Sequence, residues 1–60
     1  MSMITAAIKD AEAIIERLST ASAYPDGHYG RFMALSEASI MANGLNNYIS
    51  KIPHDERTNH

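Results

Sequence analysis

The stretch FMALSEASIMANGLNNYIS, residues 32–50, decides the fold of this 60-residue chain. It carries one charge, at Glu37, among small, apolar and amide side chains. Helical spacing relates one set of apolar positions, namely Leu35, Ala38, Ala42, Leu45, Ile49 and Ile52. A second set spreads over neighbouring faces: Phe32, Met33, Ile40, Met41, Gly44 and Tyr48. A helix of this composition has no fully solvated face, so it needs cover on more than one side.

A shorter helix precedes this stretch and can supply part of the cover. Residues 3–21 carry an apolar stripe at helical spacing, made of Ile4, Ile8, Ala11, Ile15 and Leu18. Ser2 is a suitable N-cap for that helix. The break SAYPDGHYG, residues 22–30, holds Pro25 and Pro-Asp-Gly turn chemistry, and Asp26 is a candidate cap for the second helix.

These signals predict an all-α fold, an antiparallel two-helix hairpin. The expected hairpin covers residues 1–52, with a helix over about 3–21, a turn over 22–30 and a helix over about 28–51. Pro53 ends the second helix, and residues 53–60 are expected to be a polar C-terminal tail.

The short length of the chain points to assembly with other copies. A 60-residue domain buries only about 60% of its unfolded surface, and small domains add disulfides, metals or oligomerisation. The chain has no cysteine, and its three histidines show no ligand spacing, so no metal or other cofactor is expected. One stripe of the second helix can cover the first helix, and the other stripe then needs a second chain. We therefore expect a helical homo-oligomer.

The expected oligomer interface lies along the second helix. Its members are Leu35, Ala38, Ile40, Met41, Ala42, Asn43, Gly44, Leu45, Tyr48 and Ile49. Gly44 would permit a close helix crossing, with a local kink as the alternative explanation. Asn43 could bond across the interface and fix its register, whereas the other reading leaves most of the neighbouring asparagines facing water.

The turn is the candidate ligand site. Tyr24, His28, Tyr29 and Arg31 lie within eight residues, around two glycines and a helix start. Aromatic rings stack on nucleobases, arginine binds phosphate, and amides at a helix N-terminus attract anions. The alternative is structural: the tyrosines pack the turn against the helices, and Arg31 pairs with Asp26.

Other function classes find little support in the sequence. Ser36, Ser39 and Ser50 have no histidine at helical spacing within the second helix, and no carboxylate pair lies on an apolar face, so we expect no enzyme. The net charge of −2 offers no basic stripe for duplex nucleic acid. No apolar run approaches a membrane span, and residues 1–13 lack signal-peptide features, so the expected location is cytoplasmic.

The segment from Arg31 to Leu45 carries a leucine, a Glu-Ala pair, bulky residues and Ala-Asn, at Leu35, Glu37, Ala38, Ile40, Met41, Ala42 and Asn43. This pattern resembles the second helix of the helical-hairpin family of phage anti-CBASS and anti-Thoeris sponge proteins, although Arg31 stands closer to Leu35 than the arginine of that family does. The resemblance covers about half the chain. It implies a small protein that is not an enzyme and that forms oligomers, of which a hexamer is one possibility. It also implies that the protein sequesters cyclic di- or oligonucleotide messengers of bacterial immunity in the host cytoplasm.

Two functional hypotheses follow from these observations. The first is a phage sponge in which Tyr24 and Tyr29 stack on bases while Arg31 and His28 hold phosphates. The second is a small helical protein–protein interaction inhibitor, of the anti-CRISPR kind, which docks on its target through the second helix. A four-helix dimer that binds RNA is a weaker third reading, because the chain is acidic and exposes few cations.

Overall fold

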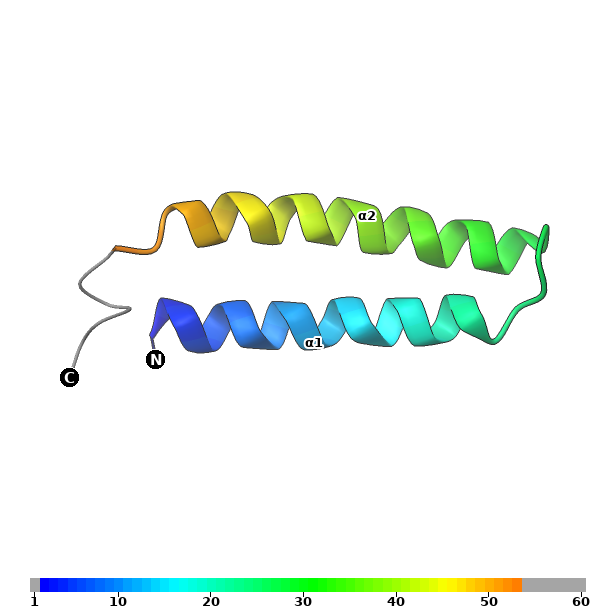
Figure 1. Ribbon diagram of the computed structural model, residues 1–60, viewed down its shortest axis with the longest axis horizontal. Coiled ribbons are helices and arrows are strands. Elements are labelled where there is room, and N and C mark those ends of the chain that lie inside the picture. Colours follow the sequence, from blue (N-terminus) through cyan, green and yellow to red (C-terminus); the bar gives the residue numbers. More distant parts are fainter. Residues whose placement is uncertain (1, 54–60) are drawn as a thin grey trace.

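The computed structural model describes residues 2–53 as an antiparallel hairpin of two helices (Figure 1). Helix α1 spans Met3–Ser22 and helix α2 spans Tyr29–Ser50. The longest extent of the hairpin is 46 Å, and the turn lies at the end opposite residue 2. The predicted all-α hairpin is confirmed. Apart from Pro53, the predicted polar tail lies outside the described residues.

Local chemistry sets the start and the end of α1. Ser2 has an extended backbone, and its Oγ accepts the amide of Thr5 at 3.0 Å, which confirms it as the N-cap. At the other end, the amide of Ala23 donates to the carbonyl of Thr20 at 3.1 Å. This tight last turn directs the chain toward Pro25, where the helix cannot continue.

The most buried positions of the seam between the helices are alanines. The buried apolar residues of the described chain are Ala21 of α1 with Ala34 and Ala38 of α2, each at most 5% exposed. Because a methyl side chain occupies little space, the two helix axes can approach closely at these positions. Met41, Leu45, Tyr48 and Ile52 continue the line of Ala34 and Ala38 at helical spacing and are half-buried.

The helices are rotated relative to the packing that the sequence suggested. Of the predicted α1 stripe, Ile8 is 54% exposed, Ile15 60% and Leu18 46%. On α2, Leu35 and Ile49 of the predicted stripe are 43% and 48% exposed. Ala38, Leu45 and Ile52 of the α2 stripe face α1, whereas the larger side chains named above lie beside the seam.

Two further features define the surface of the hairpin. Arg17 Nη1 donates to Glu37 Oε1 across the helices at 3.1 Å, in an exposed ion pair. A Cβ placed on Gly44 would meet nothing within 4 Å, so the expected close crossing at Gly44 does not occur within the hairpin. Neither α1 nor α2 is long and apolar enough to cross a membrane.

Candidate functional site

A tight turn joins the two helices and carries the residues of the candidate site. The amide of His28 donates to the carbonyl of Pro25 at 3.1 Å, which closes a four-residue turn. Gly27 occupies the third position of this turn with φ of +81°, a conformation that glycine adopts without steric penalty. The turn therefore places His28 and Tyr29 directly at the start of α2.

His28, and not Asp26, caps α2. Its backbone is extended, and its Nδ1 accepts the amide of Gly30 at 2.8 Å. Because Nδ1 is an acceptor here, the ring carries its proton on Nε2. Asp26 lies in the turn, two residues before the cap, with its carboxylate near Arg31. One of the amides at the start of α2 that could have attracted an anion therefore already donates to the His28 ring.

Tyr24 supports the turn from outside the pocket. Its ring stacks on the ring of His28, with centroids 4.7 Å apart and an interplanar angle of 21°. It also lies directly against Gly30, where an added Cβ would come within 2.6 Å of the ring. The absence of a side chain at Gly30 is therefore what lets Tyr24 pack at the start of α2.

Arg31 ties the turn to the end of α1. Its Nη1 donates to the carbonyls of Ala21 and Tyr24, both at 3.4 Å. Its Nε lies 3.6 Å from Asp26 Oδ1, and the guanidinium side chain is 36% exposed while Asp26 is almost fully exposed. The cation also sits favourably near the carbonyl end of α1. Arg31 consequently has a structural role, while part of its guanidinium group still faces solvent.

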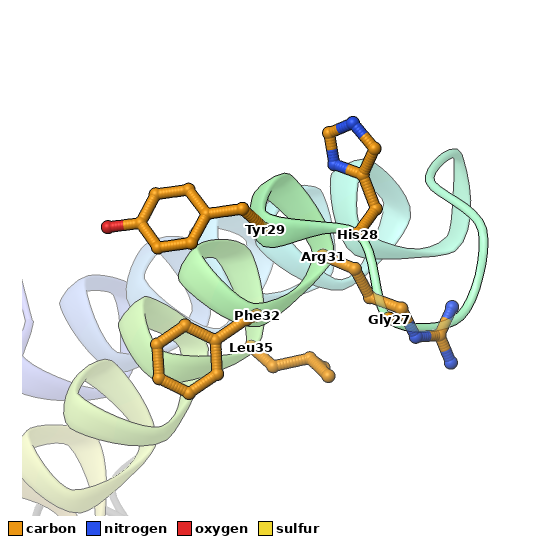
Figure 2. A pocket seen from close by; sticks show the side chains of 6 residues that line it. All are labelled: Gly27, His28, Tyr29, Arg31, Phe32 and Leu35. Carbon is orange, nitrogen blue, oxygen red and sulfur yellow. The ribbon is translucent and has the colours of Figure 1, made fainter.

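A pocket of about 520 Å³ opens at the start of α2 (Figure 2). The residues that line it are Gly27, His28, Tyr29, Arg31, Phe32 and Leu35. The rings of Tyr29 and Phe32 project to the same side of α2, with centroids 6.1 Å apart. Figure 2 shows the Arg31 side chain running toward the turn and the His28 ring pointing away from the two other rings.

The structure brings together three of the four predicted ligand residues. His28, Tyr29 and Arg31 line the pocket, whereas Tyr24 is not among its lining residues. Sequence reasoning missed Phe32 and Leu35 as members of the site. Spacing is the sequence signal that could have identified Phe32, because it follows Tyr29 by three positions and so lies on the same part of the helix surface.

The predicted interface residues of α2 divide into two groups. Four of them lie on the side of α2 that faces α1, namely Ala38, Met41, Leu45 and Tyr48, of which Ala38 is buried. The remaining members are exposed: Leu35, Ile40, Ala42, Asn43, Gly44 and Ile49. The exposed group is therefore the more available to another molecule, while Met41, Leu45 and Tyr48 remain partly accessible.

The turn carries side chains that can make stacking contacts and hydrogen bonds. Two exposed rings, a cation and an imidazole can stack and donate hydrogen bonds. Within residues 2–53, no three histidine, aspartate or glutamate side chains are grouped so that they could hold a metal ion. Comparisons with family models, curated proteins and solved structures found no match to the chain.

Proposed function

We propose that this protein binds a cyclic di- or oligonucleotide and thereby sequesters a second messenger of bacterial immunity, as a phage anti-defence sponge would. One observation carries the proposal: Tyr29 and Phe32 leave two aromatic rings 70% and 62% exposed, beside the cation of Arg31. Large exposed rings are unfavourable in water, and nucleobases are flat partners that would cover them.

Each pocket residue has a distinct role under this proposal. Tyr29 and Phe32 stack on bases, and Arg31 binds a phosphate through the part of its guanidinium group that faces solvent. His28 can donate from Nε2, because Nδ1 already accepts the Gly30 amide. Tyr24, expected from the sequence to stack on a base, serves instead to hold His28 and the start of α2 in place.

The proposal includes assembly and location. We propose a cytoplasmic homo-oligomer, so that the turn pocket is repeated once in each subunit. Such repetition suits a protein that removes a ligand from solution, because capacity then grows with the number of subunits. The resemblance of α2 to the sponge family supports this reading.

The direct test is calorimetric titration of the purified protein with a panel of cyclic di- and trinucleotides. For the ligand that binds, Tyr29→Ala and Phe32→Ala should each weaken affinity by about 1–3 kcal/mol, or roughly 5- to 150-fold. Ile40→Ala is the matched control, because Ile40 is 71% exposed on α2 but does not line the pocket. No binding by folded wild-type protein to any member of the panel would count against the proposal.

A charge experiment tests the phosphate role of Arg31. Asp26→Asn removes the carboxylate that lies 3.6 Å from Arg31 Nε, so it should strengthen phosphate binding. Glu37→Gln is the control for net charge, because it also removes one negative charge and Glu37 pairs with Arg17 away from the turn. If Arg31→Gln leaves both circular dichroism and nucleotide affinity unchanged, Arg31 is not part of the ligand site.

A second candidate function rests on a different observation. Ile8, Ile15 and Ile40 are large apolar side chains that are each more than half exposed. Such residues favour docking on another protein, as in a helical inhibitor of the anti-CRISPR kind. This candidate predicts a hairpin that binds no cyclic nucleotide and stays monomeric until its target is added.

A further inference from the structure

One side of the hairpin is an uninterrupted apolar surface shared by both helices. A groove on this side is lined by Ile4, Ala7, Ile8 and Ala11 of α1, by Leu45 and Ile49 of α2, and by Ile52 just after α2. We define the apolar face by the six large side chains that lie on it: Ile4, Ile8, Ile15, Leu18, Leu35 and Ile49.

Steps of seven residues extend this surface along both helices. Ile15 follows Ile8 by seven positions, and Leu35 precedes Ile49 by fourteen. Seven residues make almost two full turns, so residues at this spacing return to the same side of a helix within about 20°. Leu18 is likewise seven positions from Ala11, which lines the groove. The apolar face thus runs from the helix ends to the turn.

The apolar face differs in charge from the other side of the hairpin. No member of the face is charged, although five of them are between 43% and 60% exposed. The grooves lined by Met41 carry the charged residues Asp10, Glu16, Arg17 and Glu37. The apolar face therefore lacks the charged side chains that help water to solvate the other side, although Ile40 is exposed there.

The heptad pattern of α2 is that of a helix in a bundle. Most of its apolar positions fall in three registers, which begin at Ala34, Ala38 and Leu35 and repeat every seven residues, while Phe32, Met33 and Ile40 lie outside them. The first two registers form the seam with α1, and the third, Leu35-Ala42-Ile49, remains outside it. A two-helix seam needs two apolar registers per heptad, whereas a helix in a larger bundle uses three.

The small core of the hairpin and the area of its apolar face favour a second copy of the chain as the molecule that covers this face. The buried apolar core of the described hairpin is three alanines, which is small for a stable domain. Two helices about 30 Å long and about 10 Å wide present a face of about 600 Å². Pairing two such faces buries about 1,200 Å², the lower limit for a specific interface.

The geometry points to face-to-face pairing of two copies of this chain through the apolar face, which gives a four-helix unit with a shared core. This inference gives the proposed homo-oligomer a defined interface and does not depend on the nucleotide. Leu35 belongs both to the apolar face and to the turn pocket. The second copy would therefore contribute a wall to the pocket, which is open on that side in a single hairpin.

Sedimentation velocity of the protein without nucleotide tests the inference. Wild-type protein should run as a dimer or a multiple of two, and Ile15→Asp should shift it to the monomer. Ile40→Asp is the matched control, because Ile40 is 71% exposed but lies outside the apolar face. A wild-type chain that runs as a folded monomer would overturn the inference and leave the face to a different protein. Dissociation by Ile40→Asp but not by Ile15→Asp would overturn it as well.

Two measurements remain decisive if Ile15→Asp fails to fold. The melting temperature of wild-type protein should rise over about a hundredfold range of concentration, as expected when association stabilises the folded state. The chain has no cysteine, so single cysteines can report contact between copies. Ala11→Cys should form a covalent dimer with a short bismaleimide, whereas Lys9→Cys, on the outer surface of α1, should not. A constant melting temperature or equal cross-linking at both positions would refute the pairing. Failure of nucleotide binding would leave these results unchanged.

Discussion

Alanine substitutions at Gly44 and Gly30 should change stability in opposite directions, although both glycines lie in α2. At Gly44 an added Cβ meets nothing within 4 Å. The substitution should then stabilise the folded protein by the difference in helix propensity between alanine and glycine, about 1 kcal/mol. For a domain of this size that corresponds to a rise in melting temperature of about 4–8 °C.

At Gly30 the same substitution meets the ring of Tyr24. The new Cβ would lie 2.6 Å from its Cζ and under 3.0 Å from both Cε atoms, so the ring has to move. Overpacking costs about 1–3 kcal/mol, and loss of the stacking between Tyr24 and His28 costs about 0.5–1.5 kcal/mol. Together these exceed the gain in propensity, and we expect a net loss of about 1 kcal/mol.

A double-mutant cycle separates the steric effect from the propensity effect. In a Tyr24→Ala background the obstacle is absent, so Gly30→Ala should become stabilising by up to about 1 kcal/mol. Urea unfolding followed by circular dichroism, at one fixed protein concentration, measures all four variants. If Gly30→Ala has the same effect in both backgrounds, the described packing of Tyr24 is wrong. If Gly44→Ala destabilises the protein, Gly44 must be in contact with another chain.

Three further predictions concern the caps and the cross-helix ion pair. Ser2→Ala should lower the free energy of unfolding by about 1 kcal/mol, measured by urea titration, because the Thr5 amide loses its acceptor. His28→Ala should also destabilise the protein while His28→Asn should largely preserve its melting temperature, since asparagine is a strong N-cap. The pair Arg17–Glu37 should show a coupling energy below about 1 kcal/mol in a double-mutant cycle, because both side chains are 40–51% exposed.

The hairpin itself could be predicted because its signals are local. Helical spacing, the Ser2 cap and the Pro25 break each act within a few residues, and they place the helices within about two residues of their observed bounds. The cap of α2 was misassigned because aspartate is the commoner N-cap, whereas the ring of His28 reaches the Gly30 amide from the residue directly before the helix.

The rotation of the helices could not be predicted from periodicity. The second helix is apolar in several registers, so spacing alone does not say which register meets α1. Side-chain size decides it, because Ala34 and Ala38 allow a closer approach than Leu35 would. The pocket is partly missed for a related reason: periodicity places Phe32 in the second apolar set without saying what it contacts, and in the structure its exposed ring lies beside Tyr29.

The choice of alanine for the seam bears directly on assembly. A hairpin that works alone gains most by burying its largest side chains between its own helices. This chain buries Ala21, Ala34 and Ala38 there and leaves Ile8 and Ile15 more than half exposed. The alanine seam draws the helices together and sets their rows of large side chains side by side on one surface. That arrangement gives little stability to one copy, and under the proposed pairing the same exposed side chains would form the contact between two copies.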